Sequence, residues 1–257
     1  MFWEPFDYFE SETYGKLSGL KKLASLFLSF PLSYMRLADY TASQRVDYFI
    51  SNSQTVRKRV KDYYRRNSLV VYPFVDIKKI ERKRLSGGDY FIVISRLLSW
   101  KKVDLAIKAC NELHLHLKVI GEGPDLERLR SLSGPTIEFL GFVPEDEKFR
   151  YLKGCKALIN TQLEDFGIVS LEAMACGRPV IAYGKGGVLE TVLPSVTGEF
   201  FDKQEVKSLV KTLKAFDPTR YSDKECVVQA EKFDKENFQL KLADIVNVVY
   251  LESGQNL

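Results

Sequence analysis

The chain has 257 residues, enough for one large domain or for one domain and part of another. Hydrophobic residues make up 45% and charged residues 28% of it, proportions that are ordinary for a soluble globular protein. A net charge of +4 is too small to indicate a nucleic-acid-binding protein. The apolar stretch 23–32 is too short to span a membrane and contains Pro31, and no signal-peptide pattern is visible.

Cysteine and histidine are sparse. The four cysteines lie far apart, none in a C-x-x-C pair or a loop cluster: Cys110, Cys155, Cys176 and Cys226. This pattern is typical of reduced, buried thiols, so we expect a cytoplasmic protein. The two histidines, His114 and His116, fall in a strand-like run at 113–119, and we expect no metal site built on them.

The amino-terminal section differs in composition from the rest. Residues 1–12 are rich in aromatic side chains, and the pattern of residues 20–40 predicts an amphipathic helix with a basic polar side: Lys21, Lys22 and Arg36. Packing of this helix against a domain is the favoured interpretation, because the basic residues are few. The alternative is peripheral contact with an anionic surface, the inner face of the plasma membrane.

The next section contains short elements followed by a connector. A strand is expected at 47–51, and Ser53 is placed to cap a basic helix at 54–64. A second short strand is expected at 70–73. The charged connector 76–88, which ends in two glycines, is the expected domain boundary.

From Tyr90 onward the sequence alternates between strand and helix patterns. Strands are expected at 90–94, 115–120, 137–140, 157–160, 180–182 and 198–201, and helices at 103–113, 125–132, 145–153, 168–175, 205–216 and 233–251, with Pro144 at the first position of the third helix. Such alternation predicts an α/β fold in which a parallel sheet carries helices on both faces. Ligands of such sheets bind at the carboxyl ends of the strands.

The loop that leaves the first of these strands contains two cations, Arg96 and Lys101. A guanidinium forms two parallel hydrogen bonds and an ammonium acts as a compact point charge, a combination that suits a diphosphate. The alternative is a solvated basic loop with no ligand.

The segment 160–182 contains two carboxylates, Glu164 and Glu172, around a helix. Gly167 permits close approach of a ligand to the backbone before the helix begins, and Cys176-Gly177-Arg178-Pro179 ends it. The layout brings both carboxylates to one edge of the sheet. Alternatively, a glutamate in the first turns of a helix merely complements the helix dipole.

A third motif follows the strand expected at 180–182. Gly186 and Gly187 open a short helix whose free N–H groups can hold phosphate, and Glu190 lies in that helix. An ordinary turn is the alternative. Because all three motifs follow strands, together they favour a ligand site.

These motifs resemble those of the carboxyl-terminal, donor-binding domain of GT-B glycosyltransferases of the retaining family 4. The resemblance covers residues 90–201 and rests on R-x4-K, GEGP at 121–124, IEFLGFV at 137–143, E-x7-E, GRPVIA and GG-x-x-E. Within that family the segments 51–76 and 164–192 are most similar to the mannosyltransferase branch that uses GDP-mannose. Lys102 stands where many relatives have glycine.

The resemblance implies a role for each motif residue. Arg96 and Lys101 neutralise the diphosphate, Glu164 orients the donor sugar, and Glu172 accepts hydrogen bonds from the ribose. The remaining expected substrate-binding residues are Phe142, Val143, Phe166, Gly167, Ile168, Gly186, Gly187 and Glu190. Retention at the anomeric carbon is implied, and no divalent metal or other cofactor is required besides the nucleotide-sugar donor.

The resemblance also implies a domain organisation. Residues 1–76 correspond to the tail of an amino-terminal Rossmann-like acceptor domain, 77–88 to a linker, 89–230 to the nucleotide-sugar-binding domain and 231–257 to a helix that crosses back. The acceptor side is expected to be truncated, so a separate chain that supplies the missing part is an expected partner.

The expected function is transfer of mannose from a nucleotide-sugar to a glycan or lipid-linked acceptor, with no nucleic-acid partner. The alternative is a non-catalytic nucleotide-sugar-binding module or an inactive truncated remnant. A dinucleotide-dependent oxidoreductase is disfavoured, because Gly121-Glu122-Gly123 lacks the third glycine of the G-x-G-x-x-G motif.

Overall fold

The computed structural model describes residues 19–80 and 88–254. The aromatic segment 1–12, the side chains of Lys21 and Lys22, and Gly87 lie outside this description. The chain divides into two compact units, whose described parts are 19–51 with 57–69 and 52–56 with 70–254. The elements are α2 (Gly19–Ser43), β1 (Ile50–Ser51), α3 (Gln54–Tyr64), β2 (Leu69–Val70), η2 (Ile77–Lys79), β3 (Phe91–Ile94), η3 (Ser99–Lys101), α4 (Val103–Glu112), β4 (Leu117–Ile120), α5 (Leu126–Ser131), β5 (Ile137–Gly141), α6 (Glu145–Gly154), β6 (Leu158–Asn160), α7 (Ile168–Ala175), β7 (Val180–Tyr183), η4 (Gly187–Glu190), β8 (Gly198–Phe201), α8 (Val206–Ala215), η5 (Pro218–Arg220), α9 (Asp223–Glu231) and α10 (Lys235–Gly254).

The smaller unit contains α2, which confirms the helix expected at 20–40. The hydroxyl of Tyr64 donates a hydrogen bond to the carboxylate of Asp39 at 2.7 Å. Burial and this carboxylate raise the pKa of Tyr64, so the phenol remains a hydrogen-bond donor at neutral pH. The hydroxyls of Ser51 and Ser68 also share a buried hydrogen bond of 2.6 Å. Polar contacts of this kind help to hold the unit together.

The strands expected at 47–51 and 70–73 form, but they are shorter than predicted. Only β1 and β2 pair, as a two-stranded sheet. Beyond this pair Tyr72 packs on the rings of Phe166 and Phe233, with centroid distances of 5.5 Å to each. Pro73 has no N–H to extend a ladder. Aromatic packing therefore replaces strand pairing at this point.

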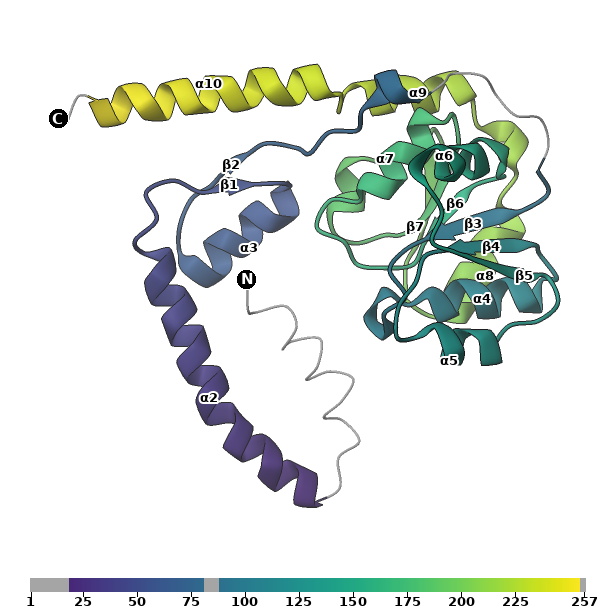
Figure 1. The fold of residues 1–257 in the computed structure, drawn as a ribbon, viewed down its shortest axis with the longest axis horizontal. Helices are drawn as coiled ribbons and strands as arrows, with labels where there is room; N and C mark the ends of the chain where they lie inside the picture. Colours follow the sequence, from purple (N-terminus) through teal and green to yellow (C-terminus); the bar gives the residue numbers. More distant parts are fainter. Residues whose placement is uncertain (1–18, 81–87, 255–257) are drawn as a thin grey trace. The chain divides into compact units, whose positions relative to one another are not determined.

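The larger unit is built on a six-stranded parallel sheet with the order β5-β4-β3-β6-β7-β8 (Figure 1). This is the doubly wound order, in which the chain starts at the centre, winds to one edge and then returns to wind to the other. The direction of winding changes between β3 and β6, whose carboxyl ends therefore border the expected ligand crevice. The predicted α/β fold with helices on both faces is confirmed.

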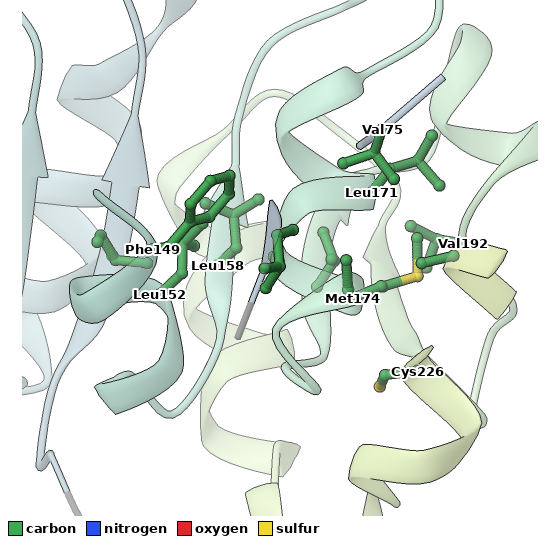
Figure 2. Close-up of a cluster of buried hydrophobic side chains, with 14 of the residues drawn as sticks. Val75, Phe149, Leu152, Leu158, Leu171, Met174, Val192 and Cys226 are labelled. Atoms are coloured by element: carbon green, nitrogen blue, oxygen red, sulfur yellow. The ribbon is translucent and has the colours of Figure 1, made fainter. Parts of the chain in front are cut away.

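Two hydrophobic cores cover the two faces of this sheet. One core contains buried side chains from α6, α7 and α9, and the other contains buried side chains from α4, α5 and α8. Figure 2 shows the first core, which includes Leu158 of β6, Phe149 and Leu152 of α6, Leu171 and Met174 of α7, and Cys226 of α9. Strands buried on both faces explain the continuous apolar runs in the sequence.

Several local expectations need correction. The helix α9 was not predicted, although Ser222 accepts a hydrogen bond from the Glu225 N–H in a recognisable capping arrangement. The two histidines are not in a strand: His114 has φ +52 in the turn after α4, and His116 precedes β4. Pro144 is the cap residue of α6 and not its first helical residue. Turn geometry, which hydrophobic periodicity does not encode, decides the last two cases.

The expected linker and crossing helix are only partly described. Within the connector, η2 buries Ile77, and the Val75 N–H just before it donates to the carbonyl of Phe233 at 3.0 Å. The helix expected at 233–251 is confirmed as α10, and its Phe238 ring lies 5.0 Å from that of Phe74. The domain boundaries at 76 and 88, and the crossing of α10 onto another domain, stay predictions.

Candidate functional site

The loop after β3 is anchored by the GEGP turn that follows β4. The buried Leu97 donates its N–H to the Glu122 carbonyl at 2.9 Å and accepts a hydrogen bond from the Asp125 N–H at 3.1 Å. Two turns at neighbouring strand ends therefore support each other. The loop that contains Arg96 and Lys101 is consequently fixed relative to the sheet.

The two expected cations have different environments. The ammonium of Lys101 lies 3.6 Å from Glu164 Oε1, and these side chains are only 18% and 16% exposed. The same ammonium lies 4.3 Å from the ring centroid of Trp100, a cation–π distance. Arg96 is exposed, and no hydrogen bond or ion pair of its guanidinium occurs with the rest of the described chain. Lys101 is thus already docked at the carboxylate, whereas Arg96 is free to meet an anion.

Lys102 occupies a backbone conformation that explains the glycine of the related sequences. Its φ of +56° and ψ of +32° lie in the left-handed region, immediately before α4 begins. A residue with a Cβ atom adopts this region at some cost, and glycine adopts it freely. Lys102 therefore holds a conformation that glycine would adopt at lower cost.

Glu164 is held by its neighbours in a single orientation. The amide of Asn160 donates to Oε2 at 3.0 Å, and the amide of Gln162 donates to Oε1. Gly167, with φ +94°, lies so close that a Cβ atom there would be 3.2 Å from Oε2. The glycine therefore leaves room for the carboxylate, in addition to shaping the start of α7.

A pocket opens at the carboxyl ends of β3 and β6, where the direction of sheet winding changes. Its polar lining comes from the loop after β3 and from the end of β6, and its apolar lining from the sheet, α4 and α7: Val93, Ile94, Ser95, Lys101, Val103, Leu158, Ile159, Asn160, Thr161, Gln162 and Val169. The pocket lies where the doubly wound topology predicts a ligand. Lys101 is its one charged lining residue within the described chain.

Glu172 has a cationic partner that sequence reasoning missed. The ammonium of Lys148, from α6, donates to Glu172 Oε1 at 2.8 Å, and the two side chains are 18% and 13% exposed. The neighbouring Cys176 thiol has its pKa raised to about 12, chiefly by burial. Lys148 and Glu172 come from different helices and are 24 residues apart, so no local pattern marks the pair.

The loop before α7 is fixed by aromatic packing. The ring of Phe166 is buried and stacks on Tyr72, and its centroid lies 5.6 Å from that of Phe233. The N–H groups of Ser170 and Leu171 both point back to the Gly167 carbonyl. Ile168 and Val169 occupy the first two positions of the helix, whose N–H groups have no acceptor within a helix. The side chain of Phe166 therefore belongs to the core, so its expected contribution to ligand binding can come only from its backbone.

The glycine pair packs one loop on another. Gly187 donates its N–H to the Glu164 carbonyl at 2.8 Å, so this N–H is not available to hold phosphate as expected. A Cβ atom on Gly187 would lie 2.0 Å from the Asp165 carbonyl oxygen, and one on Gly186 would lie 2.4 Å from that of Glu164. The pair is required for this close approach, which places the Glu164 loop.

Glu190 also has a structural partner. Its carboxylate accepts hydrogen bonds from the N–H groups of Gln54 and Thr55, at 2.8 and 3.0 Å, and from the Thr55 hydroxyl at 3.1 Å. Ser53 accepts from the Val56 N–H at 3.0 Å, which confirms the predicted cap. The carboxylate therefore stabilises the first turn of α3, and its expected contact with a ligand stays a prediction.

The two residues expected to meet a nucleotide base differ in accessibility. Phe142 is 76% exposed, whereas Val143 packs on the core around α6 and α7. Only the Phe142 ring is therefore free to stack. Within residues 19–80 and 88–254, no group of three or more metal-ligating side chains is found and no helix is both long and apolar enough to cross a membrane.

Comparison with known proteins decides the family. The model of the family described as glycosyl transferases group 1 matches residues 75–232. The chain belongs to this family. The matched region contains every motif discussed above, from the loop after β3 to Glu190.

Curated relatives of this glycosyltransferase-family chain include two mannosyltransferases. It is 32% identical over 157 residues to the GDP-mannose-dependent alpha-(1-6)-phosphatidylinositol monomannoside mannosyltransferase of Mycolicibacterium smegmatis, covering 53% of this chain and 41% of that protein. It is 29% identical over 218 residues to the alpha-1,3/1,6-mannosyltransferase of Mus musculus, covering 70% and 51%. The chain thus spans about half the length of the curated relatives it matches. Other relatives are glycogen synthases of Xanthomonas oryzae, at 30% identity.

Solved structures confirm the GT-B-type fold. The sucrose-phosphate synthase of Thermosynechococcus elongatus matches with a TM-score of 0.77 and 19% identity, covering 86% of this chain and 62% of that one. Anabaena HepE in complex with UDP and glucose matches with a TM-score of 0.71 and 22% identity, covering 84% and 67%.

Proposed function

We propose that this chain provides the donor-binding part of a glycosyltransferase that transfers mannose from GDP-mannose, with retention, to a glycan or lipid-linked acceptor. Membership of the family supports glycosyl transfer. The names of the two mannosyltransferase relatives support the choice of donor. Glycogen synthases among the relatives make a glucose donor the principal competitor.

The observation that carries the proposal is the cation–carboxylate pair of Lys101 and Glu164. This pair lies near the carboxyl ends of β3 and β6, between which the direction of winding changes. When the bond between the anomeric carbon and the diphosphate breaks, negative charge grows on the leaving diphosphate. An ammonium fixed in a largely buried position stabilises that charge at little reorganisation cost, which is where electrostatic catalysis contributes most. Arg96, exposed and without a protein partner in the described chain, adds a guanidinium to the same anion.

The two carboxylates then divide the remaining contacts. Glu164, next to Lys101, accepts hydrogen bonds from hydroxyls of the donor sugar. Glu172 uses Oε2 for the ribose, because its Oε1 is bound to Lys148. The exposed Phe142 ring stacks on the base. In this proposal the two cations neutralise the diphosphate, so donor binding requires no divalent metal.

The experiment is a comparison of nucleotides by isothermal titration calorimetry, in the presence and absence of EDTA. We expect GDP and GDP-mannose to bind more tightly than UDP-glucose, with EDTA without effect. Tighter binding of UDP-glucose would contradict the choice of donor, and binding of no nucleotide would contradict the proposed function as a whole.

Turnover is tested separately by proton NMR of GDP-mannose cleavage, with water or an added mannoside as acceptor. Release of the α anomer, before mutarotation, is the expected result for retention. Binding without cleavage under every acceptor condition would support the alternative, a non-catalytic nucleotide-sugar-binding module.

A further inference from the structure

Three consecutive polar residues at the carboxyl end of β6 are buried. Asn160, Thr161 and Gln162 have 5%, 2% and 6% of their surface exposed. Burial of an amide or hydroxyl is costly unless it finds hydrogen-bond partners. Where their hydrogen bonds go therefore indicates what these residues do.

The two amides converge on one carboxylate. Asn160 Nδ2 donates to Glu164 Oε2 at 3.0 Å and also lies 3.3 Å from Ser170 Oγ. Gln162 Nε2 donates to the other oxygen, Glu164 Oε1. Each oxygen of the carboxylate thus receives one amide N–H from a buried side chain.

The amides are themselves fixed by further contacts. The Asn160 side-chain oxygen accepts a hydrogen bond from the Gln162 N–H at 3.3 Å. The Gln162 side-chain oxygen accepts from the hydroxyl of Ser95 at 3.4 Å. The Gln162 backbone N–H can only donate, so the Asn160 amide cannot flip without losing two hydrogen bonds. The Ser95 hydroxyl, which also donates to the Arg96 carbonyl at 3.1 Å, can donate or accept, so the acceptor-only carboxylate of Glu164 is what directs the Gln162 NH₂ group.

The residue between the amides supports the neighbouring cation. The Thr161 hydroxyl donates to the backbone carbonyl of Lys101 at 3.1 Å, and the Thr161 carbonyl accepts from Gln204 Nε2 at 2.9 Å. The same short segment therefore holds the backbone of Lys101 and the carboxylate of Glu164. This common support accounts for the 3.6 Å separation of their charged groups.

We propose that Asn160 and Gln162 are positioning residues that clamp Glu164 as an ionised acceptor for two hydroxyls of the donor sugar. This inference rests on the proposed function for its ligand. NH₂ groups can only donate, so they match a carboxylate and not a protonated carboxyl turned toward them. The Glu164 carboxylate has about four lone-pair sites. The hydrogen bonds from the two side-chain amides use one site on each oxygen, which leaves about one site on each oxygen for a sugar hydroxyl. In this arrangement Glu164 accepts hydrogen bonds and does not deliver a proton.

The decisive variant is Gln162→Glu. It keeps the shape of the side chain and replaces the NH₂ group that donates to Glu164 by a second carboxylate. Two carboxylates at hydrogen-bond distance share one proton, so the pKa of the pair is raised, although the Lys101 ammonium facing Glu164 opposes this. The protonated pair restores one O–H donor to Glu164. The loss of function in the variant, relative to the wild type at the same pH, should therefore depend on pH.

The measurement is the ratio of the dissociation constants of GDP and GDP-mannose, which isolates the contribution of the sugar. At about pH 8 we expect Gln162→Glu to lose this contribution by about tenfold, the worth of one charge-assisted hydrogen bond, with GDP affinity unchanged. At about pH 5.5 the contribution should return as the shared proton is bound. Gln162→Met has no hydrogen-bond donor at any pH, so it should lose the contribution of the sugar at both pH values.

Gln229→Glu is the matched control. Gln229 is buried to the same extent, at 5% exposed, and donates to the Thr191 carbonyl at 2.9 Å while accepting from Lys232. It touches neither Glu164 nor Lys101 in these contacts. The sugar contribution should therefore match the wild type at both pH values. An equal loss in the control would attribute the effect to general disturbance of the core and overturn the proposal.

Urea unfolding without any ligand tests the clamp independently of the proposed function. A shared proton raises the folded-state pKa of the pair above its unfolded value, so the native state binds more protons and stability falls as pH rises from about 5.5 to 8. We expect the urea midpoint of Gln162→Glu to fall over this range relative to that of the wild type. A parallel pH dependence in the two proteins would overturn the clamp. Absence of nucleotide binding by the wild type would overturn only the ligand assignment.

Discussion

The two glutamates of the site are held in different ways. Glu164 receives two neutral amide donors from buried residues of its own loop and faces Lys101 at 3.6 Å. Glu172 has a cation from a different helix, Lys148, directly bonded to one oxygen at 2.8 Å. Both carboxylates thus have a cationic partner, but Glu164 is oriented by neutral amides, whereas one oxygen of Glu172 is directly hydrogen-bonded to its cation, which a ligand must accommodate.

This difference separates two kinds of contribution to function. A preorganised group costs no reorganisation when charge develops, so it contributes to the chemical step. A carboxylate oxygen that already accepts a direct hydrogen bond from a protein cation, as Glu172 Oε1 does from Lys148 at 2.8 Å, contributes mainly to binding, whereas the 3.6 Å separation leaves Lys101 and Glu164 without such a bond. We therefore expect changes at the Lys101–Glu164 end to affect turnover and changes at the Lys148–Glu172 end to affect nucleotide affinity.

The largest effect is expected from Lys101→Ala. Removal of one preorganised electrostatic group lowers turnover by about 10² to 10³-fold in comparable sites. The rate of GDP-mannose cleavage measures this effect, and GDP affinity measured in parallel should fall much less. Lys108→Ala, which removes the partner of Asp104 on α4, is the control. Equal losses of rate and affinity would break the distinction between the two ends of the site.

Glu172→Ala should weaken GDP binding by about tenfold, which corresponds to about 1.4 kcal/mol, with a smaller change in the rate of the bound donor. The physical reason is the loss of a charged acceptor for the ribose hydroxyls. Calorimetric titration with GDP gives the affinity. An unchanged dissociation constant would remove the ribose role assigned to Glu172.

Lys148→Met should weaken GDP binding by about threefold to fivefold, because Glu172 loses the contact that orients it and its charge is left largely buried. Lys148→Arg can make the same charge-assisted bond and should restore most of the affinity. A gain in affinity in Lys148→Met would show that the lysine competes with the ribose, and would reverse the interpretation of the pair.

Glu190 belongs to neither the Lys101–Glu164 pair nor the Lys148–Glu172 pair. The substitution Glu190→Gln should therefore lower the stability of the fold without a change in GDP affinity. The carboxylate stabilises the first turn of α3 through two backbone N–H groups, so its loss should cost about 1 kcal/mol of unfolding free energy. Urea unfolding gives this value. A loss of nucleotide affinity instead would return Glu190 to the ligand-binding residues.

The smallest effect is expected from thiol modification at Cys176, a neighbour of Glu172. Burial raises the pKa of its thiol to about 12, and the thiols of Cys110, Cys155 and Cys226 behave alike. Iodoacetamide should therefore modify the native protein very slowly at neutral pH, which mass spectrometry can follow. Since the native state keeps these protons above the unfolded pKa, stability should fall as pH rises beyond about 9. Rapid modification of Cys176 would show that the α6–α7 side opens readily.

The parts of the fold that depend on periodicity could be predicted from the sequence. Alternating apolar runs and helical patterns indicated the parallel sheet, and the rule that ligands bind at strand carboxyl ends placed Arg96, Lys101 and Glu164 at one edge. The doubly wound order brings β3 and β6 together, which is why Lys101 and Glu164 meet although they are far apart in the chain. The two side chains lie close together as expected, and their roles in donor binding stay a prediction.

The parts that depend on contacts between distant segments could not be predicted. Glu190 meets Gln54 across 136 residues, and Lys148 meets Glu172 across 24, with nothing local to mark either pair. The N–H of Gly187 is used by the Glu164 carbonyl, a choice that depends on how two loops pack. By contrast, the capping pattern at Ser222 was present in the sequence and could have revealed α9.

The most direct test of the central claim is an experimental structure of the chain with bound GDP-mannose. We predict that the diphosphate lies within ion-pair distance of Lys101 Nζ, that Arg96 turns toward it, and that sugar and ribose hydroxyls bind Glu164 and Glu172. A nucleotide that binds away from the carboxyl ends of β3 and β6, with Lys101 still paired only to Glu164, would contradict the account.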